Sequence, residues 1–269
     1  MRQIFPEHEF EPTLDTLESS KNNPGPQDTS SVLVWVIDLT QPPDILRHLR
    51  DVLSPEERSR ADRFVQHKTR IQYTIAHGAL RHILGVHLGI DPHILQFTEQ
   101  SHGKPHLPGK MLRFNLSHAG DLALLAVGYG RELGVDVEPV RSLSDALDLA
   151  QRFFSVTETA KLLTVTLPDL PRSFFECWTR KEAFIKATGQ GLSYPLHSFD
   201  VTFYPDPEPK LTTLPEHRGR WSLHNLIPAP NYCGALVVEH TQVAPEPPDI
   251  QLRRWKSSDF LDGRSFKYD

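Results

Sequence analysis

Apolar and polar positions follow one another along the chain in an order that predicts a strand, a helix and further strands. The run Val32–Leu39 is almost entirely apolar, which is typical of a strand buried on both faces. Ser54-Pro-Glu-Glu57 then has the form of a capping box with proline at the first helical position. The helix predicted from there closes near Gly89 and carries apolar residues at roughly 3.6-residue spacing: Ile71, Ile75, Leu80, Ile83 and Leu84. Three strand-like segments follow, at 95–98, 111–116 and 122–127.

The same order returns in the second part of the chain. Residues 132–138 alternate between apolar and polar as a strand does. Helical patterns then begin at three places, which are Ser144, Ser155 and Pro171. Strand candidates finish the pattern at 199–204, 221–227 and 232–239. A strand, helices and three strands, given twice, predict two similar α+β halves that meet at the turn 128–131, and ligands often bind where two such halves meet.

The two ends of the chain differ from this pattern. Residues 1–30 have turn and linker composition with little apolar surface, so we expect a flexible N-terminal arm. The halves then span residues 31–130 and 131–242. From residue 243 to 269 a proline-rich stretch leads into mixed charge, which predicts a peripheral tail anchored by Trp255 and Phe260.

Composition narrows the class of protein. The chain has 269 residues and a formal net charge of −5, which argues against nucleic acid or an anionic membrane as a partner. Its two cysteines, Cys177 and Cys233, exclude a disulfide framework and Cys-rich zinc sites. No signal peptide is apparent, and the longest apolar run, 32–37, is far shorter than the about 20 residues of a membrane span. We therefore expect a cytoplasmic protein.

The segment Gly134-Val-Asp-Val-Glu138 is the strongest local signal for chemistry. Residues two apart in a strand point to the same face, so Asp136 and Glu138 present two carboxylates together. Adjacent carboxylates repel unless a cation neutralises them, and hard oxygen ligands of this kind suit magnesium. A solvated strand edge with two ordinary surface acids explains this segment alone equally well.

Three further segments carry weaker signals. Glu182 and Lys186 lie four apart on one predicted helix and so share a face, although an isolated pair of this kind is usually a surface ion pair. Ser117 and His118 follow a strand pattern and are predicted in a tight turn between strands, where they could hold a phosphate. Lys104 stands in the rigid turn Gly103-Lys-Pro105. Taken singly, each of these is more simply a turn or surface residue.

In combination, these segments resemble the Sfp-type 4′-phosphopantetheinyl transferase family. Four elements occur in that family's order: Gly-Lys-Pro, Phe-Asn-x-Ser-His, Gly-x-Asp-x-Glu and Trp-x-x-Lys-Glu-Ala-x-x-Lys-x-x-Gly-x-Gly-Leu. The match runs from about Lys104 to Leu192, and four motifs in order are specific where one is not. The resemblance implies an α+β fold with two α/β halves in a pseudo-twofold arrangement and the active site in the cleft between them.

The resemblance also implies an activity and a partner. Proteins that look like this transfer the 4′-phosphopantetheine arm of coenzyme A to a serine of an apo acyl or peptidyl carrier protein in fatty acid, polyketide or non-ribosomal peptide biosynthesis. The products are holo carrier protein and 3′,5′-ADP. Two other readings compete: a non-catalytic module that binds carrier proteins, and a magnesium-dependent nucleotide phosphohydrolase. Because two halves in one chain complete the cleft, we expect a monomer.

Site roles follow from the matched motifs. Asp136, Glu138 and Glu182 are expected to bind Mg²⁺, with Glu182 also the general base toward the carrier serine. Lys186 is expected to hold the pyrophosphate and stabilise charge on the leaving 3′,5′-ADP, and His118 to assist catalysis. The residues expected to grip coenzyme A are Lys104, Ser117, His118, Lys186 and Arg70. Arg70 enters because Gln72 stands where related sequences often carry an arginine for the 3′-phosphate.

Overall fold

The first half of the chain starts with the expected strand and continues through helices into an antiparallel hairpin. The structure, a computed structural model, describes residues 29–99, 102–206, 208–213, 221–242 and 245–261. The elements of the first half are β1 (Ser31–Asp38), α1 (Pro43–Asp51), α2 (Pro55–Arg63), α3 (His67–Leu88), η1 (Pro92–Ile94), β2 (Thr98–Glu99), β3 (Pro105–His106), β4 (Leu112–Ala119) and β5 (Leu122–Tyr129). Most of the arm predicted at 1–30 lies outside the described residues.

The second half repeats a strand, helices and strands. Its elements are β6 (Leu133–Pro139), α4 (Ala146–Phe153), α5 (Val156–Leu162), α6 (Leu170–Thr188), η2 (Gly191–Ser193), η3 (Leu196–Ser198), β7 (Asp200–Val201), β8 (Leu211–Thr213), β9 (Trp221–Leu226) and β10 (Tyr232–Glu239). Two elements follow it, β11 (Asp249–Arg254) and α7 (Ser257–Leu261). The mixed α+β class is confirmed.

Helix boundaries follow local signals in some places and tertiary contacts in others. The capping box at the start of α2 is present, with Ser54 N donating to Glu57 Oε2 at 2.9 Å and Glu57 N donating to Ser54 Oγ at 3.2 Å. The single helix predicted from Ser54 to Gly89 is wrong, because Phe64 adopts an extended backbone and separates α2 from α3. Its ring packs on Tyr73 with centroids 5.4 Å apart, which compensates for the break.

Each half builds a sheet with the same strand order. The first sheet has the order β11-β1-β5-β4 and the second β6-β10-β9. In both, the first strand of the half pairs antiparallel with the last strand, and the last strand pairs antiparallel with the one before it. The strands β1, β5 and β4 are therefore connected and paired in the same way as β6, β10 and β9, and β11 is an additional strand of the first sheet.

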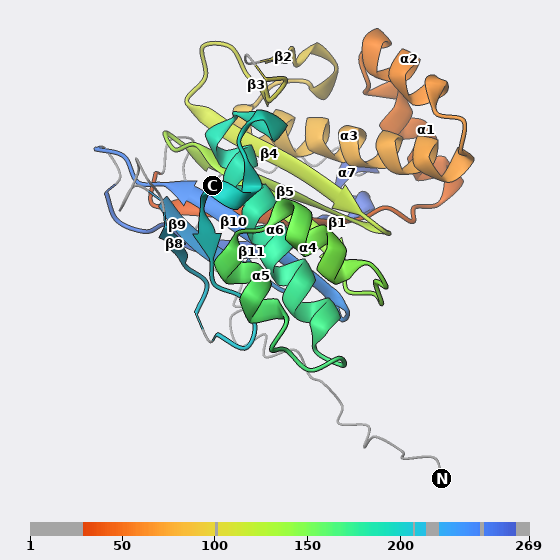
Figure 1. The fold of residues 1–269 in the computed structure, drawn as a ribbon. Helices are drawn as coiled ribbons and strands as arrows, with labels where there is room; N and C mark the ends of the chain where they lie inside the picture. Colours follow the sequence, from red (N-terminus) through yellow and green to blue (C-terminus); the bar gives the residue numbers. More distant parts are fainter. Residues whose placement is uncertain (1–28, 100–101, 207, 214–220, 243–244, 262–269) are drawn as a thin grey trace, which may run out of the picture.

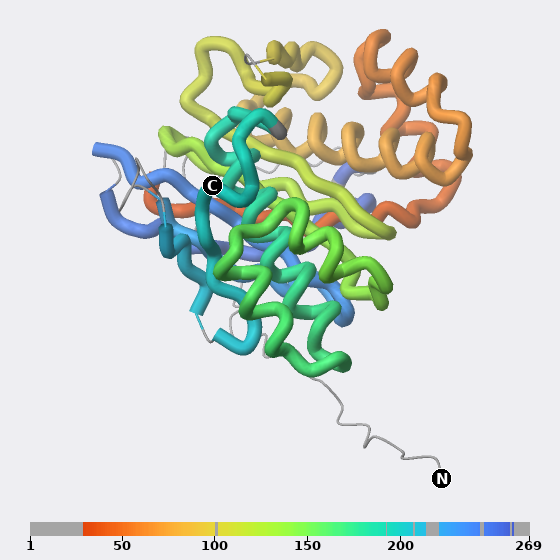
Figure 2. The backbone as a smooth tube through the Cα atoms, in the orientation of Figure 1, coloured from red at the N-terminus to blue at the C-terminus, as the bar shows by residue number. Residues whose placement is uncertain are grey.

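The two sheets pack against each other between two layers of helices (Figures 1 and 2). Strand β1 shows the arrangement: Leu33, Trp35 and Ile37 join a core with α1 and α3, while the alternate valines of the strand join a core with β6 and β10. A third core lies between β10 and the helices α4 and α6. Burial on both faces is the reason that β1 reads as a continuous apolar run.

The segment predicted as a peripheral tail adds a strand to the first sheet. Strand β11 pairs parallel with β1, with Val34 opposite Leu252. Immediately after it Trp255 is 6% exposed, and its Nε1 donates to His82 Nδ1 at 3.1 Å. Covering β1 with β11 removes an apolar edge strand that would otherwise be open to pairing with another chain.

Replacing Trp255 with alanine is expected to destabilise the protein by about 3–5 kcal/mol, because the indole is buried in the core beneath α3. The measurement is the free energy of unfolding in denaturant. Leu252→Ala, at a side chain 41% exposed on β11, is the matched control and should cost less than about 1 kcal/mol. A loss at Trp255 as small as that of the control would contradict the anchoring role.

The two cysteines and the apolarity of the helices bear on what composition predicts. Cys177 and Cys233 are free and buried, and desolvation raises the pKa of the Cys233 thiol to about 12. Within the described ranges, no helix combines the length and the apolarity that crossing a lipid bilayer requires.

Candidate active site

Strand β6 presents its acids on one face, as the alternation predicts. Val135 and Val137 point into the core between the two sheets. Asp136 points the other way, toward α6, and is 5% exposed, whereas Glu138 near the end of the strand is less buried. Position along the strand therefore gives the two carboxylates different access to solvent.

Gly134 allows α6 to lie directly on β6. A Cβ built on this residue would stand 2.2 Å from Ala183 O and 2.2 Å from Ala187 N, which are backbone atoms of α6 that cannot rotate away. Only glycine therefore permits this separation. The glycine of the Gly-x-Asp-x-Glu motif thus has a packing reason, which is to bring the helix of Glu182 and Lys186 onto the strand of Asp136.

Gly134→Ala is expected to destabilise the protein by about 3 kcal/mol, because the added methyl group must push α6 off β6. A displacement of about 1 Å at the site should also lower the catalytic rate of the folded fraction about 100-fold. Gly109→Ala is the control: its φ is +66°, but no atom lies within 4 Å of the added Cβ. If Gly134→Ala were no more destabilising than Gly109→Ala, the close approach would not be essential.

Two polar side chains from other elements meet at Asp136. Lys186 Nζ on α6 lies 2.6 Å from Asp136 Oδ1, and Ser117 Oγ on β4 donates to the same oxygen at 2.7 Å. Lys186 Nζ also donates to Ser117 Oγ at 2.9 Å. The other oxygen, Asp136 Oδ2, is buried and has no hydrogen-bond partner among the described residues. The three motifs meet here, and Ser117 brings in the first half.

Glu138 and Glu182 interact with Asp136 through their charges. Burial raises the pKa of the Glu182 carboxyl above its ordinary 4.5, and the charge of Asp136 raises it further. Burial and then Asp136 raise the pKa of Glu138 in the same way, with a smaller contribution from Glu182. The charge of Asp136 therefore acts on both glutamates, and the charge of Glu182 also acts on Glu138.

Ser117 and His118 do not lie in a turn, so that part of the sequence prediction is wrong. Strand β4 continues to Ala119, and the turn is made by Gly120, whose φ is +58°. The apolar pattern of the strand stops early because Ser117 faces the polar site and His118 is exposed. Ser117 is buried against Asp136, and His118 lies on the opposite, exposed side. Partial burial and then the charges of His77 and Lys186 lower the pKa of His118.

Lys104, in the first half, contacts three residues of the second half. Its Nζ lies 2.9 Å from Glu132 Oε2 and donates to Leu133 O at 3.0 Å and Ala187 O at 3.1 Å. An ammonium group has three donors, so none is left for a phosphate in this conformation. Its side chain is only 8% exposed. Lys104 therefore lies between the start of β6 and the end of α6.

The structure does not bring Arg70 together with the acids. Its guanidinium donates to Phe64 O at 3.1 Å and lines a hollow of about 340 Å³ between α1, α2 and α3. Gln72 instead points to the turn after β4, where its Nε2 donates to Gly120 O at 2.7 Å. Side chains two positions apart on a helix point about 200° apart. Arg70 and Gln72 therefore cannot both point to the turn after β4.

Asn115 is a site-supporting residue that sequence reasoning missed. Its Oδ1 accepts a hydrogen bond from Val135 N at 2.8 Å, next to Asp136. No strand ladder joins β4 to β6, so this side chain satisfies a backbone donor in its place. Its position two residues before Ser117, on the same face of the strand, was the available signal.

Comparison with known proteins identifies the family of this chain. A family model described as "4′-phosphopantetheinyl transferase superfamily" matches residues 132–237, and one described as "4′-phosphopantetheinyl transferase, N-terminal" matches residues 42–129. The chain is 39% identical over 214 residues to 4′-phosphopantetheinyl transferase HetI of Nostoc sp. strain PCC 7120, covering 78% of this chain and 88% of that protein. It is 30% identical over 201 residues to 4′-phosphopantetheinyl transferase Sfp of Bacillus subtilis strain 168, covering 74% and 87%. The chain therefore belongs to the 4′-phosphopantetheinyl transferase superfamily.

Proposed function

We propose that this protein transfers the 4′-phosphopantetheine moiety of coenzyme A to a serine of an apo carrier protein. The observation that carries the proposal is the meeting of Asp136, Lys186 and Ser117, to which Glu138 and Glu182 are coupled by charge. Such a group of fixed acids beside an amine suits transfer of a phosphoryl group, where positioning and electrostatics supply most of the catalysis. The transferase names of HetI and Sfp support the same reaction.

A divalent ion such as Mg²⁺ is part of the proposal, and the carboxylate chemistry of the donor set suits it. The buried Asp136 Oδ2 has no partner among the described residues, and Glu138 and Glu182 are carboxylates made costly by burial and mutual repulsion. Among the residues that the structure describes, no three His, Cys, Asp or Glu side chains already stand close enough to hold a metal. Asp136, Glu138 and Glu182 would hold the ion, which would neutralise charge on the pyrophosphate of coenzyme A.

The remaining roles belong to the chain's own side chains. In the proposed reaction the carrier serine oxygen bonds to the pantetheine-side phosphorus, and 3′,5′-ADP leaves with the electrons of the broken phosphoanhydride bond. Glu182 accepts the serine proton, which its raised pKa favours over an ordinary carboxylate. Lys186 lies beside the acids and stabilises charge on the departing phosphate, with Ser117 as a second phosphate contact. The role of His118 stays a prediction, since its ring lies on the opposite side of β4.

Lys104 and Arg70 are not included in the proposed phosphate site. The ammonium of Lys104 already has three acceptors, and the guanidinium of Arg70 is directed toward Phe64. The repeated strand order supports a pseudo-twofold relation between halves 31–130 and 131–242, with the site at their junction. A monomeric state and a cytoplasmic location stay predictions.

A single assay separates this function from its competitors. The protein is incubated with Mg²⁺, coenzyme A and an apo carrier protein, and the mass of the carrier is measured. A gain of one phosphopantetheine group is the expected result. An unchanged carrier that binds tightly would indicate a non-catalytic binding module, and breakdown of coenzyme A or nucleotide without any carrier would indicate a phosphohydrolase.

Magnesium is expected to raise the melting temperature more at about pH 7 than at about pH 5. The folded-state pKa values of Glu138 and Glu182 lie above their ordinary 4.5, so their contribution to stability is full below that pH and is lost as pH rises through the folded values. The metal binds the deprotonated acids and therefore offsets this loss at neutral pH.

The measurement is thermal unfolding with and without Mg²⁺ at both pH values. Glu182→Gln should reduce the magnesium shift, whereas Glu208→Gln, at an exposed residue paired with Lys210, should leave it unchanged. Equal shifts at the two pH values would argue that these carboxyls are not the ligands.

A further inference from the structure

Helix α6 meets its sheet at a close contact that does not by itself fix the helix direction. Ala183 and Ala187 lie over Gly134 on β6, which sets how near the helix comes. The core between α6 and β10 also holds the helix on the sheet, but apolar contacts are non-directional. The distance of 2.6 Å between Lys186 Nζ and Asp136 Oδ1 depends on the helix direction, so directional contacts elsewhere on α6 matter for the site.

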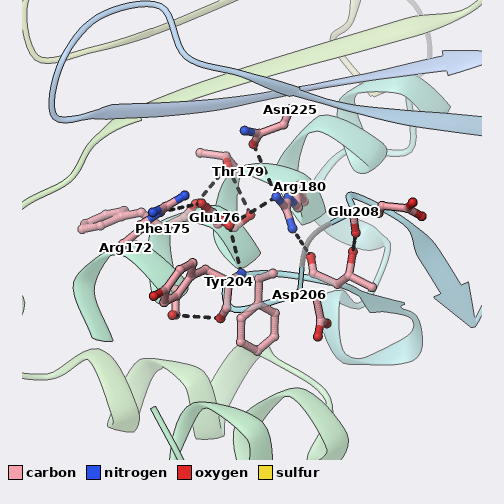
Figure 3. A network of polar contacts seen from close by, with 12 residues as sticks. Arg172, Phe175, Glu176, Thr179, Arg180, Tyr204, Asp206, Glu208 and Asn225 are labelled. Carbon is pink, nitrogen blue, oxygen red and sulfur yellow. Dashed lines mark hydrogen bonds and ion pairs between the residues drawn. The ribbon is translucent and has the colours of Figure 1, made fainter. Parts of the chain in front are cut away.

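A buried ion pair on α6, between Arg180 and Glu176, contacts β9, which is the edge strand opposite β6 in the same sheet (Figure 3). Arg180 Nη2 lies 3.2 Å from Glu176 Oε2 and 3.3 Å from Asn225 Oδ1 on β9. Arg180 Nη1 donates to Thr202 O at 2.5 Å. The side chains of Arg180 and Glu176 are 4% and 6% exposed, so these contacts are largely shielded from water.

The carboxylate of Glu176 extends the same network to the segment after β7. Its Oε2 accepts from Tyr204 N at 2.9 Å, and its Oε1 accepts from Arg172 Nε at 2.9 Å (Figure 3). Arg172 differs from Arg180 in one respect that matters: its side chain is 54% exposed. It reaches the same carboxylate from outside, whereas Arg180 connects that carboxylate to β9.

We propose that Arg180 and Glu176 are positioning residues that set the direction of α6 by anchoring it to β9 and to residues 202–204. With Gly134 at β6 and Arg180 at β9, the helix is held over both edge strands of the three-stranded sheet. Two separated fixed points prevent pivoting, and they place Glu182 and Lys186 against Asp136. The catalytic consequence rests on the proposed function, but the geometric one does not.

Energetics support a role in orientation rather than in stability alone. Replacing a buried ion pair with apolar side chains is often neutral or stabilising. Such a pair therefore adds little to the free energy of folding beyond what well-packed apolar side chains would add. Hydrogen bonds from a guanidinium are directional, and they join three named partners from three parts of the chain. An apolar side chain of similar length would fill the space without specifying the helix direction.

Arg180→Met tests the proposal in the transfer assay. We expect kcat to fall about tenfold or more with the KM for coenzyme A changed less than about twofold, because a misdirected α6 displaces Glu182 and Lys186 in the reacting complex. Arg172→Ala is the matched control, since it removes a contact to the same carboxylate but none to β9. Its kcat should match that of the wild type. A folded Arg180→Met protein that loses less than about tenfold in kcat overturns the proposal.

Asn225→Ala decides the question if Arg180→Met does not fold. Asn225 is exposed, so its replacement removes the β9 contact while the ion pair on α6 persists. We expect kcat to fall at least about twofold with an unchanged melting temperature, and a smaller loss overturns the proposal. Asn225→Asp keeps an acceptor for Arg180 and should restore the wild-type rate; failure to do so overturns it as well.

A distance measurement separates this proposal from the proposed function. Spin labels are attached at Gln190→Cys, just after α6, and at Lys110→Cys in the first half; both positions are exposed, and the native cysteines are buried. The distribution of distances between the labels should shift or broaden in Arg180→Met and stay unchanged in Arg172→Ala. That result supports the anchor even if the wild-type protein transfers nothing, and an unchanged distribution in a folded Arg180→Met protein overturns it.

Discussion

Replacing Asp136 with alanine is expected to lower kcat/KM for phosphopantetheine transfer on the order of 10³-fold while the protein stays folded. The change removes the oxygen that holds Lys186 and Ser117, and with it the buried Oδ2 that we assign to the metal. Lys186 is 28% exposed, so its freed ammonium can be solvated without unfolding the protein. The measurement is the rate of carrier modification, with circular dichroism to confirm folding.

Asp62→Ala is the control for this variant. Asp62 is also an aspartate in an ion pair, with Arg50 at 2.8 Å, but it is 53% exposed and lies on α2 away from β6. Its loss should change the transfer rate less than about twofold, since exposed ion pairs contribute about 0–1 kcal/mol. A near-normal rate in Asp136→Ala would remove Asp136 from the mechanism and would leave the meeting point of the three motifs without a catalytic role.

Glu182→Gln should reduce kcat by about 10²–10⁴-fold, the range expected when a general base is lost. The amide keeps the size of the side chain but cannot accept the serine proton at neutral pH. Because burial and the neighbouring Asp136 raise the pKa of Glu182, the wild-type rate should fall with decreasing pH at values above the 4.5 of an ordinary glutamate.

The pH profile distinguishes a base from a purely structural residue. Glu182→Gln should lose the acidic limb of the profile as well as the rate, whereas a residue that only supports the fold would lower the rate at every pH equally. Glu208→Gln, at a side chain 66% exposed and paired with Lys210, should retain both. A Glu182→Gln enzyme with the wild-type profile would assign the proton transfer to another group.

Features that depend on a few neighbouring residues could be predicted from the sequence. Both capping boxes form as expected, including the second one, in which Ser155 N donates to Glu158 Oε2 at 2.9 Å. The alternation in β6 was enough to separate the buried valines from Asp136 and Glu138, since a strand has only two faces. The order of apolar segments along the chain was enough to predict a mixed α+β fold.

Predictions failed where distant contacts override local pattern. Residues 249–254 look like a polar tail, yet they pair with β1 because that strand needs a partner at its edge. The helix predicted across 54–89 breaks at Phe64, whose ring packs on Tyr73. Ser117 lies in a strand because β4 pairs with β5 up to Ala119. Its side chain faces the polar site, so the end of the strand lacks the apolar pattern that would have revealed it.

The sequence by itself determined which residue types are available for chemistry, the elements that carry them and the family to which the chain belongs. Only the tertiary structure decided which of them meet: Lys186 and Ser117 reach Asp136, whereas Lys104 is held by Glu132 and two backbone carbonyls. The physical reason is that periodicity and caps are set within one or two turns of chain. The position of α6 over the sheet is instead set by close packing and buried charges whose partners lie tens of residues away.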